Sequence, residues 1–580
     1  MELDLCYSQT LDTDDPEDSL ETVEFSVGSD ESKRYQFGET CLLRVTQNDD
    51  EKTVPLADHV WPVEHYFHVD DEQWGVRLVW RDGSGDLQAS LCPQGAFTSK
   101  SEARREAARL ASEGVPIRTG RGAEFVMGLG HWLEQANGIE VAKLTRTPGW
   151  HDECQVYCNG EWVWSNDETW YADSMHISIR RRSHRAGSAV EWSMMLDKLG
   201  TTPGLRAAVG VSLAGPLVDL IHQSSFLVHL FGPSSTGKST GLELGGSVWG
   251  EPQTIRNSWN NTVNALEGLA VVADGGCLLL DELGQFRGAD HQLALAIYNI
   301  ASQQGRNRAT RAGGLQEQRH WALTGLSTGE ISMKDRVGSH RKGGQDVRML
   351  DVPVRMGDVT EDADHADAIK AAVGLDASGG EYGQAGDAWT KWLQSELPVV
   401  EASKRRDSRH EALASDLADG AEDRRILHHC ALIGAALDLA SEVEVGRRSL
   451  VPWSQKQRDA AVRWLARRCI HHRTETTPQE RALSLLREKV QTQPHRFPTA
   501  QTIKEDRASG EIWGVRDRRD IYISQKLLKA SGVPREAGVG VQNFLKWLDE
   551  NGHAENVGRK MRAGIRCIWY ELPMDKGGSR

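Results

Sequence analysis

The stretch HLFGPSSTGKST, from His229 to Thr240, constrains the fold of this chain more than any other feature. A short apolar run leads into the pattern G-x-x-x-x-G-K-S, and a helical pattern follows it. Glycines at these positions let backbone N–H groups turn toward phosphate oxygens, and the N-terminus of the next helix adds a partial positive charge. The sequence therefore predicts a phosphate-binding loop in an α/β fold. The alternative interpretation is a surface turn rich in Gly and Ser.

The pattern also assigns a role to each loop position. Lys238 is expected to reach the β- and γ-phosphates of ATP, and Ser239 is expected to hold Mg²⁺. The full set of expected nucleotide-binding residues is Gly232, Pro233, Ser234, Ser235, Thr236, Gly237, Lys238, Ser239, Thr240 and Asp281.

A second apolar run, CLLLDE, ends in two carboxylates. Asp281 would bind Mg²⁺ through water, and Glu282 would polarise the water that attacks the γ-phosphate. An acidic pair of this kind can also be plain surface charge. Together with the phosphate loop, it indicates an ATPase whose sheet has an extra strand between the two motifs, and it argues against small GTPases and simple kinases.

A third apolar run, WALTGLST, is predicted to form a third strand about 40 residues further on. In ATPases of this type the strand ends in a polar side chain that senses the γ-phosphate. Ser327 and Thr328 both fit that role, both could instead cap a turn, and the sequence does not choose between them.

Arg348 stands just before a short apolar strand in GQDVRMLDVPV. An arginine at this place can enter the site of a neighbouring subunit and stabilise transition-state charge. That role would require a ring or a filament of subunits. A surface salt bridge is the alternative.

Two basic segments could contact DNA. The first, QQGRNRATRAGGLQEQRHW, resembles a hairpin placed before the third strand, where arginines could grip phosphates in a bidentate manner. Its arginines are Arg306, Arg308, Arg311 and Arg319. The second, NVGRKMRAGIRCIWYELP, is predicted to be the wing of a winged helix that follows the helix VQNFLKWLDENGHAE. Its phosphate-binding candidates are Arg559, Lys560, Arg562 and Arg566. A solvated hairpin and a protein-binding winged helix are the respective alternatives.

Composition limits the other possibilities. The net charge of −15 excludes a uniformly basic surface, although a local basic patch can still attract nucleic acid. No apolar run reaches the ~20 residues that a membrane span needs. The N-terminus MELDLCYSQTLDTDD lacks the basic start and apolar centre of a signal peptide. We therefore expect a cytoplasmic protein without membrane contact.

Changes in pattern along the chain predict its domains. Strand-like alternation dominates the N-terminal part, buried strands alternate with helices in the middle, and helical patterns follow. The expected divisions are an acidic flexible lead at 1–30, a β-rich α+β domain at 31–194, a P-loop ATPase core at 195–357, a helical lid at 358–475 and a winged-helix-like domain at 476–580.

The region from about Trp74 to Pro353 resembles a known family, the domain of unknown function 927, found in helicase-like proteins of phages, plasmids and integrated elements. The resemblance is carried by an ordered series of segments that continues into the helical region. The segments are WGVRLVWRDGSG, TPGWH, GPSSTGKST, SVWGEP, WNNTVNALEGLA, LLLDELGQ, LSTGEISM, GGQDVRMLDVPV, YGQAGDAW and RRILHHCALIGAALDLA.

Members of this family are similar to minichromosome-maintenance-like helicases of staphylococcal resistance cassettes. The resemblance implies an AAA+ fold, a hexameric homo-oligomer, and ATP- and Mg²⁺-dependent unwinding of single-stranded or forked DNA beside element-encoded replication proteins. The chain departs from its relatives at Asp274-Gly275-Gly276, and the lead before Trp74 leaves no room for a primase domain.

Three other functions compete with a DNA helicase. A protein-remodelling ATPase would favour aromatic pore loops, and no such loop stands out. A nucleotide switch in phage defence or replication initiation could dispense with a catalytic carboxylate, which Glu282 supplies. A DNA-binding scaffold without enzymatic activity would not need the phosphate loop.

Overall fold

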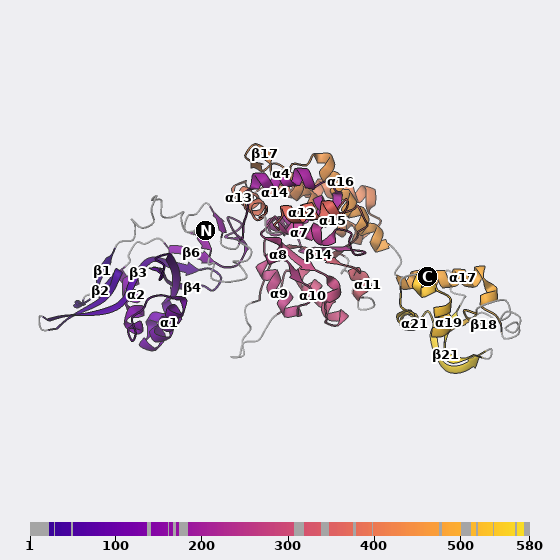
Figure 1. Ribbon diagram of the computed structural model, residues 1–580, viewed down its shortest axis with the longest axis horizontal. Coiled ribbons are helices and arrows are strands. Elements are labelled where there is room, and N and C mark those ends of the chain that lie inside the picture. The colour runs from indigo at the N-terminus through magenta and orange to yellow at the C-terminus, as the bar shows by residue number, and fades with distance from the viewer. Residues whose placement is uncertain are drawn as a thin grey trace. The chain divides into compact units, whose positions relative to one another are not determined.

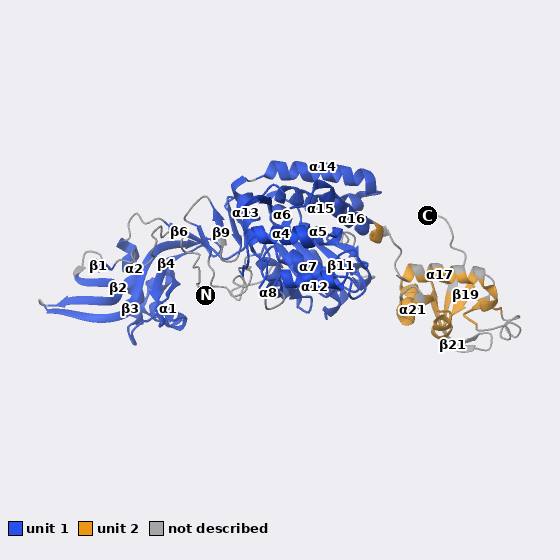
Figure 2. Ribbon diagram, turned by 45° about the horizontal axis from the view of Figure 1, so that its top comes forward, with its two compact units in different colours: residues 1–470 blue, residues 471–580 orange. Residues whose placement is uncertain are grey.

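The computed structural model describes most of the chain. The described residues are 22–27, 30–47, 50–135, 141–159, 162–165, 170–172, 184–306, 318–337, 347–374, 379–396, 398–474, 478–499, 512–517, 520–536, 539–562 and 565–573. The chain divides into two compact units, residues 1–470 and residues 471–580 (Figure 2).

A five-stranded parallel sheet lies in the first unit, with strands in the order β12-β13-β14-β11-β15. In that order the strands span Asn257–Ser258, Cys277–Asp281, Thr324–Gly329, Phe226–Phe231 and Met349–Pro353. The strand before the phosphate loop, β11, and the strand that ends in Asp281, β13, are therefore separated by β14. This confirms the expected mixed α/β protein with a parallel sheet.

Helices cover both faces of this sheet, which explains why its strands are apolar throughout. On β13, Leu279 packs into the core that includes α5 and α7, whereas Leu278 and Leu280 pack into the core that includes α9 and α10. Figure 1 shows α7 on one side of β14, and α9 and α10 on the other. The helices around the sheet span Pro203–Leu213 (α5), Gly215–Leu220 (α6), Lys238–Gly246 (α7), Pro252–Ile255 (α8), Val263–Val272 (α9), Asp290–Ala301 (α10) and Met333–Val337 (α11).

The N-terminal region is β-rich, as expected. Strands β1 to β5 form an antiparallel series, and β6 and β10 extend the sheet in parallel alongside β3. These strands span Val23–Val27, Asp30–Gln47, Asp50–His68, Gln73–Arg81, Leu87–Pro93, Val141–Thr145 and Trp170–Ala172. Helices α1 (Lys100–Glu113) and α2 (Gly122–Gln135) share an apolar core with the sheet.

Part of the stretch expected to be an acidic lead belongs to this sheet. Strand β1 pairs with β2, and Phe25 stacks on Tyr35 and Phe37 at centroid distances of 5.9 and 6.0 Å. The alternation of apolar residues in VEFSV gives β1 one face that reaches the core. The sheet therefore begins before residue 31, and residues 1–21 lie outside the described part of the chain.

A small three-stranded sheet joins the N-terminal region to the parallel sheet. It consists of β7 (Gly149–His151), β8 (Val156–Asn159) and β9 (Trp162–Ser165). The Tyr157 hydroxyl donates to the Gly275 carbonyl at 2.7 Å, and Trp150 Nε1 donates to the Pro216 carbonyl at 2.9 Å.

A helical region completes the first unit. Its helices span Ala189–Leu199 (α4), Ala363–Ala372 (α12), Gln384–Glu396 (α13), Val399–Leu417 (α14), Ala421–Ala440 (α15) and Gln455–Thr474 (α16). Helices α14 and α15 lie side by side (Figure 2), and a short hairpin of β16 (Glu444–Val445) and β17 (Arg448–Ser449) precedes α16. The end of α16 belongs to the second unit.

The second unit combines helices with a four-stranded antiparallel sheet in the order β18-β19-β21-β20. Its helices are Pro478–Thr492 (α17), Gln525–Ala530 (α19), Val533–Glu536 (α20) and Val541–Glu550 (α21). Its strands are Val515–Asp517 (β18), Asp520–Ile523 (β19), Glu555–Arg562 (β20) and Ile565–Pro573 (β21). In the described residues of the whole chain, no helix has the length and apolar character to cross a membrane.

Replacing Leu326 with Ala should destabilise the first unit by about 2–5 kcal/mol, because it opens a cavity between β14 and α7. Leu326 is fully buried, and its Cδ1 lies 2.5 Å from the place where a Cβ on Gly245 would stand. Urea unfolding of the full chain, followed by circular dichroism, measures the effect. The exposed Val400→Ala change is the control. Equal unfolding midpoints for the two variants would contradict this packing.

Candidate nucleotide-binding site

The phosphate loop connects β11 to α7 and needs glycine at both of its ends. Gly232 has φ +148°, and a Cβ there would lie 2.4 Å from the Val354 carbonyl oxygen. Gly237 has φ +84°, and a Cβ there would lie 2.5 Å from Thr360 Oγ1. Other residues would suffer both an unfavourable backbone conformation and a collision. The loop is therefore held tightly against the segment that follows β15.

Lys238 is buried at the first position of α7, and its ammonium group turns back toward the loop. Its Nζ donates to the Gly232 carbonyl at 3.0 Å and to the Pro233 carbonyl at 2.6 Å. Burial lowers the pKa of Lys238, and nearby Glu330, Glu282 and Asp281 oppose that shift. The ammonium group thus lies between the loop and a group of carboxylates, where it can meet an anion held by the loop.

Thr328 joins the two carboxylate residues at the end of β13. Its hydroxyl donates to Asp281 Oδ1 and accepts from the Glu282 backbone N–H at 3.1 Å. This contact follows from the strand pairing, in which Leu280 lies opposite Ser327 and the next residues are Asp281 and Thr328. The acidic pair is therefore fixed to the strand beside the phosphate loop.

Glu282 adopts a left-handed backbone conformation, with φ +57°. Such a conformation costs on the order of 1–3 kcal/mol for a residue other than glycine, and it is concentrated at functional sites. The side chain accepts from the Gly284 N–H at 3.2 Å, which holds the carboxylate beside the end of β13.

Ser327 faces the other side of β14 and belongs to a buried network. His229 Nε2 donates to the Ile331 carbonyl at 3.0 Å, so Nδ1 accepts from the Ser327 hydroxyl at 2.9 Å. The Ser327 oxygen in turn accepts from Trp259 Nε1 at 2.8 Å. The geometry therefore separates two residues that the sequence could not: Thr328 contacts the acidic pair, and Ser327 is engaged in the core.

Sequence inspection missed Arg256, whose guanidinium group lies close to two carboxylates. Its Nη1 is 2.8 Å from Glu243 Oε1 and 3.8 Å from Asp281 Oδ2. Burial raises the pKa of Glu243, and Arg256 opposes that shift. Arg256 follows a short helix and has no motif around it, so only the fold reveals the contact. Glu330, which accepts from the Ser234 hydroxyl at 2.6 Å, was also missed, although it lies in the segment LSTGEISM.

Arg348 lies at the opposite edge of the sheet from the phosphate loop. Its carbonyl accepts from the Leu227 N–H at 2.9 Å, next to the start of β11, whereas the loop follows the end of that strand. The distance along β11 is roughly 15–20 Å at the usual rise per residue. Its guanidinium carbon lies 4.4 Å from the centre of the half-exposed Tyr298 ring. Arg348 is therefore not part of the phosphate site of its own chain.

The expected arginine hairpin is described only at its base. The Gly305 N–H donates to the Arg319 carbonyl at 2.8 Å, and Gln304 forms an antiparallel bridge with His320. Arg306 is exposed at this base, whereas Arg308 and Arg311 lie outside the described residues.

The expected wing is a hairpin of β20 and β21. The backbones of Arg559, Lys560 and Arg562 pair with those of Ile568, Cys567 and Ile565. The side chains of the four basic wing residues lie outside the description.

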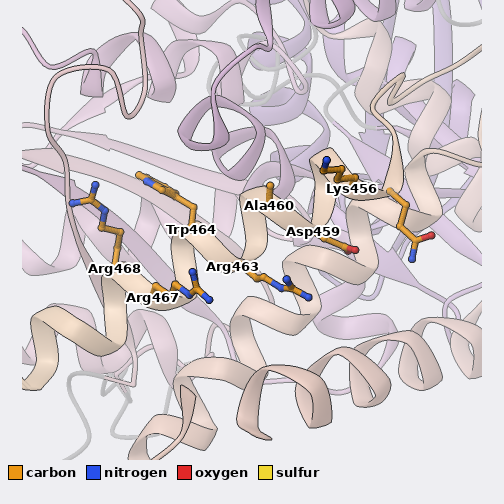
Figure 3. A pocket seen from close by; sticks show the side chains of 8 residues that line it. Lys456, Asp459, Ala460, Arg463, Trp464, Arg467 and Arg468 are labelled. Carbon is orange, nitrogen blue, oxygen red and sulfur yellow. The ribbon is translucent and has the colours of Figure 1, made fainter. Parts of the chain in front are cut away.

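A hollow of about 740 Å³ runs along α16, and half of its lining residues are basic (Figure 3). Its lining residues are Gln455, Lys456, Asp459, Ala460, Arg463, Trp464, Arg467 and Arg468. At one end, Arg468 Nη2 and Trp464 Nε1 lie 2.8 and 3.4 Å from Asp358 Oδ1. Asp358 is two residues before Thr360, which abuts Gly237, so α16 is connected to the phosphate loop through this segment.

Residues 44–320 match the model of the family described as Domain of unknown function (DUF927). The chain carries a DUF927 domain. The match includes the phosphate loop and the acidic pair; it begins before Trp74 and ends before β14. A solved structure titled "SCCmec type IV Cch - active helicase" is 19% identical, with a TM-score of 0.56, and the match covers 93% of this chain and 98% of that one. At this identity the likeness establishes a shared fold. No curated protein matches the chain.

Replacing Ser327 with Ala should lower the free energy of unfolding by about 1–3 kcal/mol, because Trp259 Nε1 and His229 Nδ1 lose their buried partner. Chemical unfolding of the full chain tests this expectation. Ser415→Ala is the matched control, since that exposed hydroxyl donates to the Ala412 carbonyl of its own helix. If both changes have equal effects, the buried network does not contribute to stability.

Proposed function

We propose that this DUF927 protein is an AAA+ ATPase that translocates along or unwinds DNA as a hexameric ring, in the replication of a phage or mobile element. The observation that carries the proposal is the strand order β12-β13-β14-β11-β15, with β14 between the phosphate-loop strand and the acidic strand. This is the arrangement expected of an ATPase with an extra strand between its two motifs. The shared fold with a solved active helicase supports the same proposal.

Within one subunit, Lys238 would neutralise the β- and γ-phosphates of ATP. The residues fit a phosphate group because the closely packed glycines leave the loop without side chains at both ends. Ser239 and Asp281 would hold Mg²⁺, which supplies positive charge to the phosphates when it is bound. Glu282 would accept a proton from the attacking water, and its backbone is fixed by Thr328. We assign sensing of the γ-phosphate to Thr328 rather than Ser327.

Arg348 would complete the site of a neighbouring subunit. Its place at the far edge of the sheet, beside half-exposed Tyr298, keeps it away from its own phosphate loop, so that any phosphate contact would be made with another chain. This role requires an oligomer, and a closed ring is the arrangement that gives every site a neighbour.

The helical region would act as a lid. The contacts of Arg468 and Trp464 with Asp358 connect α16 to the segment against Gly237, so a movement of this region can reach the phosphate loop. We propose domain limits of 1–30 for a lead that overlaps β1, 31–194 for the N-terminal domain, 195–357 for the core, 358–475 for the lid and 476–580 for a winged helix. The end of α16 at Thr474 supports the last division.

DNA contacts would come from the arginine hairpin, with Arg306, Arg308 and Arg311, and from the wing, with Arg559, Lys560 and Arg562. The helix before the wing, α21, exposes Gln542, Asn543, Lys546, Asp549 and Glu550. Its single cation against two carboxylates does not favour insertion beside phosphates. A phosphate contact by this domain would therefore use the wing.

A protein-remodelling ATPase or a nucleotide switch is the second candidate. Both share the nucleotide site, but neither needs stimulation by DNA. The ordered acidic pair favours hydrolysis over a slow switch.

Single-stranded DNA should raise the ATPase rate of the wild-type chain, and Glu282→Gln should lower the rate at least about 100-fold because it removes the base that activates water. Release of inorganic phosphate, with and without single-stranded DNA, measures both effects. Glu396→Gln, an exposed change, is the control. The helicase proposal fails if no nucleic acid stimulates hydrolysis.

Arg311→Ala should lose the stimulation while Arg104→Ala keeps it, and equal stimulation in the two would remove the hairpin from the proposal.

A mixture of Arg348→Ala and Lys238→Ala subunits should recover part of the ATPase activity that each variant lacks alone. In a shared site, the Arg348→Ala subunit still supplies Lys238 and the Lys238→Ala subunit still supplies Arg348. A junction at which these two residues meet is therefore intact. Phosphate release across a series of mixing ratios measures this recovery. No recovery at any ratio would argue that Arg348 does not act on a neighbour.

A further inference from the structure

One row of side chains crosses four strands of the N-terminal sheet. Trp74 on β4 pairs with Phe67 on β3, Phe67 pairs with Lys143 on β6, and Lys143 pairs with Trp170 on β10. Residues that lie opposite each other on neighbouring strands share a face of the sheet. The row therefore presents three aromatic rings and one ammonium group on a single face, and we call these four residues the aromatic row.

The members of the aromatic row contact one another. The rings of Phe67 and Trp74 are 4.8 Å apart, and the ring of His65 lies 4.9 Å from Trp74. At the other end, Lys143 Nζ lies 5.4 Å from the centre of the Trp170 ring. Burial lowers the pKa of His65, which favours the uncharged imidazole beside the Trp74 ring.

The row is open at the end formed by Trp74. Trp74 is 42% exposed, and it is the one exposed tryptophan among the tryptophan side chains that the structure describes. Phe67 and Lys143 are half-buried, and Trp170 is buried. Further along β4, Val76 and Leu78 on the same face are buried in the core shared with α1 and α2. The aromatic row is thus the part of this face that lies beyond that core.

The opposite face of the same strands is already packed. Tyr66, Ala142 and Leu144 form a separate buried cluster there, with Tyr171 against it. The exposed Trp74 ring and the half-buried Phe67 ring are therefore not needed to complete that cluster. A ring held on a sheet by neighbouring strands can stack on a planar ligand with little loss of conformational freedom.

We propose that the aromatic row is a stacking platform for the unpaired bases of a single-stranded nucleic acid. Nucleobases fit because each has a flat aromatic face, and aromatic rings on a sheet with a nearby cation are a recurrent way to bind them without sequence preference. Neighbouring strands lie about 4.8 Å apart, so the accessible part of the row, from Trp74 to Lys143, extends roughly 10 Å, enough for about two bases. Lys143 supplies the positive charge that a phosphate backbone requires.

Nearby acidic residues are engaged in contacts with β6 and the residue after it. Asp70 accepts from the Arg146 N–H at 2.8 Å and from the Thr145 hydroxyl at 3.2 Å, and Asp71 forms an ion pair with the Arg146 side chain. These contacts reduce the repulsion that the turn between β3 and β4 would exert on a phosphate. Glu72, in the same turn, remains a negative charge close to Trp74.

The platform rests on the proposed function, because it would bind the single-stranded nucleic acid on the N-terminal domain. Base stacking itself does not require ATP hydrolysis. The two proposals can therefore fail separately. Binding without nucleotide reports on the platform, whereas phosphate release without DNA reports on the ATPase site.

The test compares binding of the full chain to an oligothymidylate and to an abasic oligonucleotide of equal length, by fluorescence anisotropy without ATP. Wild type should prefer the strand that carries bases. Trp74→Ala and Phe67→Ala should each weaken binding of the oligothymidylate at least about fivefold while leaving the abasic strand unaffected. Trp74→Phe should keep the preference, which separates stacking from misfolding. Met194→Ala, at another exposed apolar side chain, is the control.

Lys143→Gln should weaken binding of both oligonucleotides. It should also reduce the number of counterions released on binding, measured from the salt dependence of the affinity, by about one. Its matched control is Lys391→Gln, because Lys391 Nζ also lies 5.4 Å from a tryptophan ring, that of Trp164. An oligouridylate in place of the oligothymidylate distinguishes RNA from DNA as the source of the bases. The proposal is overturned if wild type binds the abasic strand equally well, or if Trp74→Ala keeps the wild-type preference.

Discussion

The parallel pairing of β11, β14 and β13 determines where the groups of the candidate site lie. All three strands run in one direction, so the phosphate loop, Thr328 and the acidic pair follow strand ends at the same edge. The contact of the Thr328 hydroxyl with Asp281 and with the Glu282 N–H depends directly on this pairing. A shift of one residue between β13 and β14 would exchange Thr328 for Ser327 and break that contact.

Side chains alternate along β14, so the strand contributes to the candidate site on one face and to the buried core on the other. One side of the strand meets the carboxylates, and the other side satisfies His229 and Trp259 in the core. Glycines at both ends of the phosphate loop allow the segment after β15 to approach closely, and Asp358 in that segment binds α16. The candidate site is therefore in contact with the helical region, as the proposed coupling of hydrolysis to movement requires.

Much of the core was predictable from the sequence because its signals are local. Continuous apolar runs predict strands covered on both faces, and the loop pattern lies within one strand–loop–helix segment. Features that depend on strand pairing were not predictable. The choice between Ser327 and Thr328 and the contact of Arg256 with Asp281 became visible only when the strands were placed. The aromatic row is an extreme case, because its members come from positions between 67 and 170 and no local pattern joins them.

The central claim is that Lys238 and the acidic pair form one nucleotide site. Isothermal titration of the full chain with ATP and Mg²⁺ tests it most directly, using wild type, Lys238→Ala and the exposed control Lys404→Ala. The account predicts that wild type and Lys404→Ala bind ATP equally, and that Lys238→Ala binds at least about tenfold more weakly, because it lacks the charge that pairs with the phosphates. Equal affinity for all three proteins would contradict it.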